Sequence, residues 1–350
     1  MNERERQRQL EQLHRRRSVI GLPMVALRHH AYLSPPPADH CWRRQPRAVG
    51  IGIDDQAVAL WDHHAASARL LTHHGAGAND HAAVILGGAR PADFIQPLPD
   101  GHVLLVDART RGTAESAEVW DAAGTWVRSG HCGDAVQHVL ATPSGDFWIG
   151  YFDEAAASGR GLGGHGLVRF GPDMQPRWRY PFNTDLPCID DCEALNVQEE
   201  SAYASVYYAN HLISVRGSHG VDHGKTPQGG TAALLVDGEH AVLIGGYGAD
   251  YDLVTPITID AQGVQVAGDQ SRLVLPDGME VRNARWTCRG PELHAIINGS
   301  WYRASLNDFH PQPERARHHR PDLPQSADWA RRVNRAQQRI LVARSGPAPF

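Results

Sequence analysis

The sequence has almost no lysine, because Lys225 is the only one among 34 basic residues and arginine supplies the rest. It also lacks long hydrophobic runs. No stretch approaches the roughly 18 consecutive apolar residues that a membrane-spanning helix needs, which excludes a membrane span. The charged start, Met1–Arg6, is not followed by the apolar region of a secretory signal, so we expect a cytoplasmic protein.

Cysteine is scarce and scattered. The five cysteines form no C-x-x-C pair, which argues against a disulfide scaffold or a zinc ribbon and favours reduced thiols. Cys188 and Cys192 lie among acidic residues, but their spacing matches no common zinc site. The 21 histidines include no H-E-x-x-H motif.

Common catalytic signatures are missing as well. There is no G-x-S-x-G elbow, and a phosphate-loop match at Gly224–Thr226 has His219 where the first glycine belongs. Gly161–Gly166 fits G-x-G-x-x-G, but it precedes a strand and not a helix, so a dinucleotide site is not indicated. Whether the protein is an enzyme therefore stays open at this point.

Charge is unevenly distributed along the chain. Residues 1–47 carry a net charge of +6 and residues 311–350 carry +5, which leaves −16 for residues 48–310. An acidic body repels phosphate backbones, so nucleic-acid binding is disfavoured except through the two basic arms.

Internal repetition is the main positive signal. A pair of strands joined by a tight turn recurs, as at Pro99–Gly101, Pro143–Gly145 and Asp237–Glu239. The second strands of these pairs are predicted to begin at residues 57, 102, 147, 202, 241 and 292, about 47 residues apart. Four short antiparallel strands per repeat predict an all-β, six-bladed β-propeller. A β-sandwich or two small barrels is the alternative.

The two ends of the chain differ from the body. We expect residues 1–17 to be a helical or disordered basic arm and residues 18–308 to form the propeller, with 18–28 as its closing strand. Residues 309–325 are predicted to be a Pro/Arg/His linker. Residues 326–344 are predicted to form an amphipathic helix, which would dock on the propeller flank or bind a partner.

Loops that converge on one face of a propeller supply the candidate site residues. Ligand-binding candidates are Asp107, Arg109, Tyr208, Asn210, Tyr247 and Asp250. Catalytic candidates are His63, as a base, and the acids Asp153 and Glu154. Clustered carboxylates favour a hard metal ion or a carboxyl group of raised pKa. Turn-capping by these acids is the alternative interpretation.

Three segments carry a resemblance to known proteins. Trp148–Glu154, Gly166–Phe170 and Asp191–Val197 resemble uncharacterised actinobacterial six-bladed β-propeller proteins over about residues 48–306. That resemblance implies the fold and no reaction. The chain is more loosely similar to gluconolactonase-like hydrolases, which hold a divalent metal in the channel. This similarity implies Asp191 and Asn283 as ligands of Ca²⁺, Zn²⁺ or Mn²⁺.

The sequence thus supports two functional hypotheses. The first is a cytoplasmic propeller that binds a small molecule or a protein partner at an acidic channel face. The second is a hydrolase or lyase that depends on a divalent cation in the channel.

Overall fold

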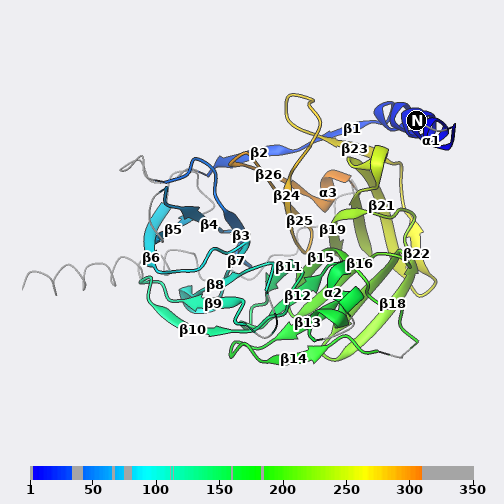
Figure 1. Cartoon of the computed structure of the whole chain (residues 1–350). Helices are drawn as coiled ribbons and strands as arrows, with labels where there is room; N and C mark the ends of the chain where they lie inside the picture. The colour runs from blue at the N-terminus through cyan, green and yellow to red at the C-terminus, as the bar shows by residue number, and fades with distance from the viewer. Residues whose placement is uncertain are drawn as a thin grey trace, which may run out of the picture.

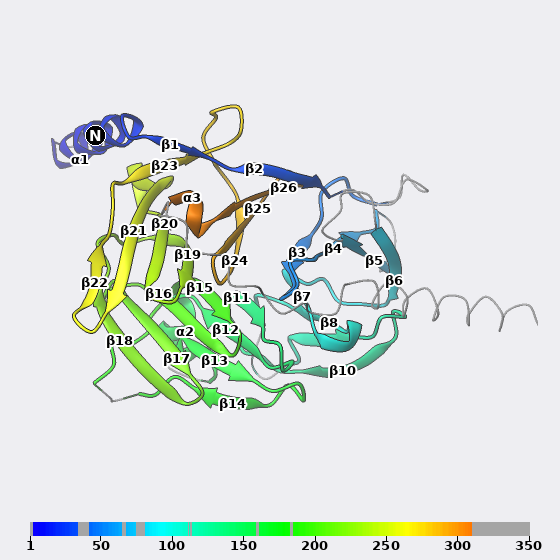
Figure 2. The same ribbon diagram turned by 180° about the vertical axis from the view of Figure 1, so that it is seen from behind.

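The computed structural model describes residues 3–33, 42–64, 68–74, 81–110, 112, 114–158, 161–182 and 185–309. Most of these residues form short antiparallel strands, and the sheets are arranged in a ring about a common axis (Figure 1). The same ring is seen from behind in Figure 2. In each run of four strands the first strand lies nearest the axis, which is the architecture of a β-propeller.

The antiparallel runs follow one another along the chain. The first three are β3 (Ala48–Ile51), β4 (Ala57–Asp62), β5 (Ala68–His74) and β6 (His81–Gly87); β7 (Phe94–Pro97), β8 (Val103–Val106), β9 (Ala117–Trp120) and β10 (Trp126–Gly130); and β11 (Val136–Ala141), β12 (Phe147–Tyr151), β13 (Leu167–Phe170) and β14 (Pro176–Arg179). The next are β15 (Cys192–Gln198), β16 (Ser201–Val206), β17 (His211–Arg216) and β18 (His219–Lys225); and β19 (Thr231–Asp237), β20 (His240–Gly245), β21 (Leu253–Asp260) and β22 (Gly263–Val266). The last is β24 (Arg285–Arg289), β25 (Glu292–Ile297) and β26 (Ser300–Ser305), completed by β2 (Arg28–Tyr32).

The remaining elements are short, apart from the N-terminal helix. They are α1 (Glu3–Ile20), α2 (Asp153–Ser158) and α3 (Leu306–Phe309), the 3-10 turns η1 (Pro99–Gly101), η2 (Gly163–His165) and η3 (Gly248–Asp250), and the strands β1 (Met24–Ala26) and β23 (Ser271–Val274), which pair in parallel. Among the described residues no helix is long and apolar enough to cross a membrane.

The hydrophobic core lies between neighbouring sheets. Leu60 of the first run packs in one cluster with Leu105 of the second, and comparable layers separate the following runs. Trp61 of the first run then packs with Ile296 and Trp301 of the last run, so the ring of layers closes. Because both faces of each sheet are covered, the second strands are short continuous apolar runs.

The turns follow the prediction closely. Strands β4, β12 and β25 begin at the predicted residues 57, 147 and 292, and β8, β16 and β20 begin one residue away from the predicted positions. Asp100 and Gly101 adopt positive φ angles of 65° and 78°, which explains why an Asp-Gly pair joins β7 to β8.

The closing strand differs from the prediction. Helix α1 continues through Ile20, because Val19 is buried and the chain leaves the helix only at Gly21. The strand that completes the last run is β2, Arg28–Tyr32, and within 18–28 only β1 is otherwise extended. Closure by a strand from the N-terminal end was therefore predicted, but for a segment several residues too early. The linker 309–325 and the helix 326–344 lie outside the described residues, apart from Phe309.

Helix α1 is held at its C-terminal end by two arginines. Arg15 Nε lies 2.8 Å from Asp250 Oδ1, and Arg16 Nη1 lies 2.6 Å from the buried Asp252 Oδ1. Arg16 also stacks over the Tyr251 ring at 4.3 Å. The hydrogen bond to Asp252 raises the pKa of Arg16 above its usual range. The basic arm is therefore a helix attached to the fifth run of strands.

A buried polar network, which we call the hub, joins the inner strands at the end where they finish. The fully buried Arg289 of β24 donates to Ile51 O of β3 at 3.0 Å, to Gln96 Oε1 of β7 at 2.6 Å and to Ala141 O of β11. Burial lowers the pKa of Arg289 to about 10, so its guanidinium stays charged at neutral pH.

Asn196 of β15 completes the hub. Its amide donates to Leu234 O of β19 at 2.7 Å and to Gly290 O at 2.8 Å, and its Oδ1 accepts from Gly290 N at 2.8 Å. Beside it, β15 and β24 form a parallel pair at Asn196 and Cys288. Two side chains therefore connect strands from all of the runs described above.

Replacing Arg289 with methionine is expected to destabilise the protein strongly. The change leaves Ile51 O, Ala141 O and Gln96 Oε1 buried without this donor, and each such loss costs about 1–3 kcal/mol. We expect the free energy of unfolding, measured with urea, to fall by about 3 kcal/mol or more. Arg216→Met, at an exposed end of β17, is the matched control and should change it by less than about 0.5 kcal/mol. Equal stabilities of the two variants would show that the hub is not a principal support.

Candidate functional site

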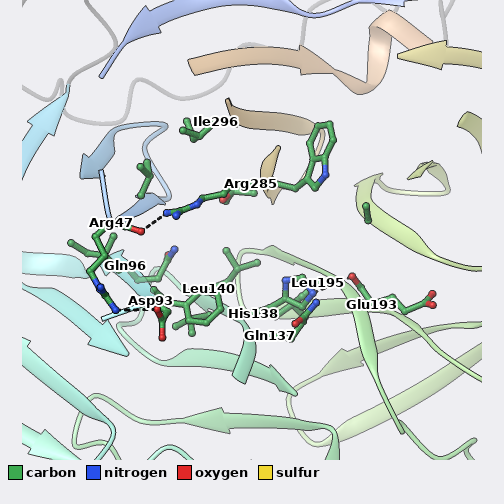
Figure 3. A pocket seen from close by; sticks show the side chains of 17 residues that line it. Arg47, Asp93, Gln96, Gln137, His138, Leu140, Glu193, Leu195, Arg285 and Ile296 are labelled. Atoms are coloured by element: carbon green, nitrogen blue, oxygen red, sulfur yellow. Dashed lines mark hydrogen bonds and ion pairs between the residues drawn. The ribbon is translucent and has the colours of Figure 1, made fainter. Parts of the chain in front are cut away.

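A cavity of about 430 Å³ lies on the propeller axis at the end opposite the hub, among the first residues of the inner strands (Figure 3). We call this end the mouth. The side chains that give the cavity its polar character come from several runs: Arg47, Asp93, Gln96, Gln137, His138, Glu193 and Arg285. Gln96 belongs to both the cavity and the hub, so the hub forms its floor.

Irregular strand pairing directs three side chains toward this cavity. The register between first and second strands shifts in β11 between Val136 and His138, in β15 between Cys192 and Ala194, and in β19 between Thr231 and Ala233. The residues at these shifts that have no partner in the second strand are Gln137, Glu193 and Ala232, and all three line the cavity. A β-bulge re-aims the side chain of its extra residue, so these bulges help to build the site.

One end of the cavity carries two arginines. Arg47 Nη1 lies 3.3 Å from Asp62 Oδ2, and its Nη2 lies 3.3 Å from Asp93 Oδ1. Arg285 donates to the backbone oxygen of Arg47, and among the described residues no carboxylate forms an ion pair with it. Desolvation in the cavity lowers the pKa of Arg285, opposed by the nearby charge of Asp93 and reinforced by that of Arg47.

Glu193 lies at the other end, where Figure 3 shows it on the opposite side from Arg285. Its carboxylate accepts from the backbone nitrogens of Gly230, at 3.2 Å, and of Thr231, at 3.3 Å, and from the Tyr247 hydroxyl. Partial desolvation, reinforced by the hydrogen bond to Glu193, raises the pKa of Tyr247 above its usual range, so the phenol keeps its proton.

His138 lies between these two ends (Figure 3). Its Nε2 is 3.2 Å from Glu193 O. Burial lowers the pKa of His138 to about 4, so the ring is neutral at neutral pH and contributes no charge to the cavity.

Asp191 lies beside Glu193 in the sequence, at the mouth. Burial and the charges of Glu193 and Asp153 raise the pKa of its carboxyl group to about 6. Its Oδ1 is buried and has no hydrogen-bond partner in the described part of the structure. Asp191 is therefore a carboxyl group that titrates close to neutral pH.

The structure brings some of the predicted residues together. Arg109 Nη1 is 2.7 Å from Glu154 Oε2, and its Nε is 3.3 Å from Asp134 Oδ1. Asp107 Oδ1 accepts from Arg109 N at 3.1 Å, and burial, with the nearby Asp93, raises the pKa of Asp107. Asp153 and Glu154 begin α2 and are exposed.

Other predicted residues lie apart. Asp250 is bound by Arg15 of α1, and His63 stacks edge-on against Trp42 with ring centroids 5.1 Å apart. Tyr208 is 81% exposed, and Asn210 accepts from Thr226 through its backbone oxygen. Asn283 lines an adjoining cavity of about 250 Å³, which shares Arg285 and Ile296 with the axial one. Of the described residues that line the axial cavity, none belongs to the predicted catalytic, ligand-binding or metal set.

The structure gives little support to a metal site at the predicted ligands Asp191 and Asn283. Asp191 lies near Glu193 and Asp153, whereas Asn283 lines the other cavity. Among the described residues, no three His, Cys, Asp or Glu side chains gather so that they could hold a metal ion. Burial raises the pKa of the Cys192 thiol well above its usual range.

Sequence reasoning missed the residues of the cavity itself, chiefly Arg47, Asp93, His138 and Arg285. Polar residues at the start of the first strand of most runs, and not those of the later loops, line the cavity, and that position is the useful signal.

Comparisons with known proteins give only distant similarities. No protein-family model matches the chain, and a search of curated proteins finds no relative. Among solved structures, the PQQ-bound aldose sugar dehydrogenase of Streptomyces coelicolor has a TM-score of 0.45 at 10% identity, covering 79% of this chain and 97% of its own. YCF48 bound to a D1 peptide has a TM-score of 0.45 at 12% identity, covering 82% of both chains. A protein described as a gluconolactonase candidate has a TM-score of 0.38 at 14% identity, covering 80% of this chain and 97% of its own. These are β-propeller proteins, and at such low similarity no function passes from them to this chain.

Replacing Asp191 with asparagine is expected to stabilise the protein at high pH. The carboxyl group titrates near pH 6 in the folded chain and near 3.8 when unfolded, so its ionisation opposes folding above about pH 6. We expect a gain of about 1 kcal/mol at pH 8, discounted because the half-buried group is partly screened by solvent. The gain should shrink as the pH falls through 6 toward 4.

Urea unfolding of both proteins at several pH values measures this difference. Asp190→Asn, which removes the adjacent acid, is the matched control. The same pH-dependent gain in both variants would show that the effect is a general one of net charge and not a property of Asp191.

Proposed function

We propose that the chain is a six-bladed β-propeller that binds a small polar molecule in its axial cavity. The observation that carries this proposal is the cavity of about 430 Å³, which is within the size range of ligand pockets and has charged side chains at both ends. A cavity of this size favours a small molecule over a protein partner, which would need a broad surface.

The fixed positions of the cavity's polar groups support binding. Glu193 is held by two backbone N–H groups and Tyr247, and Arg285 is held by Arg47 O. Groups held in this way need little reordering when a ligand arrives, which reduces the entropic cost of binding.

A metal-dependent hydrolase or lyase is the alternative, with Asp191 as the ligand closest to the mouth. It predicts that Ca²⁺, Zn²⁺ or Mn²⁺ raises the melting temperature and that a chelator reverses the rise. The proposed binding function predicts no dependence of ligand affinity on these ions. The cytoplasmic setting and the relationship to actinobacterial propellers remain predictions alongside this proposal.

Filling the cavity is expected to abolish binding. Val49 lines the cavity, so Val49→Trp places an indole where the ligand would lie. We expect fragments found by ¹⁹F NMR screening of the wild-type protein to lose at least tenfold in affinity for this variant. Thr287→Phe fills the same cavity from β24 and should have the same effect.

Val266→Trp makes the identical substitution on the outer strand β22, where Val266 is 56% exposed. It should bind every fragment as the wild-type protein does. If fragments bind all three variants equally, the axial cavity is not the binding site.

A further inference from the structure

The two charged ends of the cavity define the chemistry of its ligand, provided that the proposed function holds. Arg285 and Glu193 lie at the same level above the hub. β15 and β24 pair in parallel at Asn196 and Cys288, and each of the two charged residues precedes its paired residue by three positions. At about 3.3 Å per residue, both lie roughly 10 Å from the hub.

At this level the two side chains lie at opposite ends of the cavity. Figure 3 shows Arg285 extending toward Arg47, with Glu193 on the far side of His138 and Gln137. Their charges therefore do not neutralise each other, and no ion pair between them is formed. A ligand must supply the opposite charge at each end.

The arginine end favours an anion. Arg47 is paired with Asp62 and Asp93, whereas Arg285 donates to a backbone oxygen and forms an ion pair with no described carboxylate, although the charge of Asp93 acts on it from nearby. The planar guanidinium favours a carboxylate, which it can hold through two parallel N–H···O bonds.

The glutamate end requires a cation. Glu193 carries a negative charge that is held by neutral donors only, namely two backbone nitrogens and the Tyr247 phenol. The Tyr247 ring, whose hydroxyl donates to this carboxylate, lies edge to face with the Tyr207 ring at a centroid distance of 6.2 Å, and both rings are exposed. Aromatic faces next to a carboxylate favour an ammonium group.

We propose that the ligand is a small zwitterion whose ammonium and carboxylate groups are separated by several bonds. An α-amino acid carries its two charges on neighbouring atoms and cannot reach both ends of the cavity. The ω-amino acids and the ends of a short peptide share the required chemistry, and both are small enough for the cavity.

Calorimetric titration of the full chain tests this proposal with defined probes. The zwitterions with separated charges are 6-aminohexanoate and glycylglycine, and the reference compounds are glycine, hexanoate and hexylamine. We expect at least one separated zwitterion to bind at least tenfold more tightly than every reference compound. Tighter binding of 6-aminohexanoate identifies the ligand as an ω-amino acid, and tighter binding of glycylglycine identifies it as a peptide.

Two conservative variants assign each end of the ligand. Arg285→Gln should lower the affinity for 6-aminohexanoate at least tenfold and leave the affinity for hexylamine unchanged. Glu193→Gln should lower the affinity for 6-aminohexanoate and leave the affinity for hexanoate unchanged. Arg216→Gln, on the exposed end of β17, should change neither. Circular dichroism confirms that each variant is folded.

The proposal is overturned if singly charged compounds bind as tightly as the zwitterions, or if Arg285→Gln leaves the affinity for the separated zwitterion unchanged. Failure of this inference differs from failure of the proposed function. If no zwitterion binds but screened fragments still lose affinity in Val49→Trp, the cavity is a ligand site for another chemistry. If Val49→Trp changes nothing, both proposals fail.

Discussion

The arrangement of the whole ring depends on Arg289. A propeller blade can bury its faces only against its neighbours, so nothing within a single sheet fixes where the inner strands meet. Arg289 supplies that constraint from β24, because one guanidinium reaches the ends of β3, β7 and β11. Asn196 does the same for β19 and the turn after β24. A buried charge is costly unless its donors are satisfied, and here two backbone oxygens and Gln96 Oε1 satisfy them.

The hub also determines where a ligand can bind. At the hub end, the polar groups of the inner strands form hydrogen bonds with one another, so few of them remain for a ligand. At the mouth the strands begin further apart, and their polar groups face a cavity. The site therefore lies at the end where the fold itself leaves hydrogen-bonding and charge capacity unused.

The sequence predicted the fold well because turns and apolar strands are local features. Pro99–Gly101 specifies its turn through residues that tolerate positive φ, and such turns set the repeat. The closing strand was placed too early because the helical propensity of residues 3–17 carries on through Val19, whose burial depends on the folded body. A local sequence pattern does not show that Val19 packs against distant parts of the chain.

The site was harder to predict because it depends on irregular pairing. Period-two alternation assigns side chains to faces, and a bulge of one residue changes that assignment. Gln137 and Glu193 line the cavity because each is passed over in the pairing of its strand. Nothing in the surrounding residue types marks these bulges, so an analysis of alternation places loop residues such as Tyr208 at the site instead.

Strand β24 contributes both to the hub and to the lining of the axial cavity. Arg285 and Arg289 are four residues apart on a strand, so their side chains project from the same face, toward the axis. The guanidinium of Arg289 is buried in the hub and is bound by three acceptors. The guanidinium of Arg285 has a single backbone acceptor and lies beside the open cavity. The same residue type therefore closes the scaffold at one level and presents a guanidinium without an ion-pair partner to the cavity at the next. The difference between the two roles lies in how far the neighbouring strands have diverged from the hub.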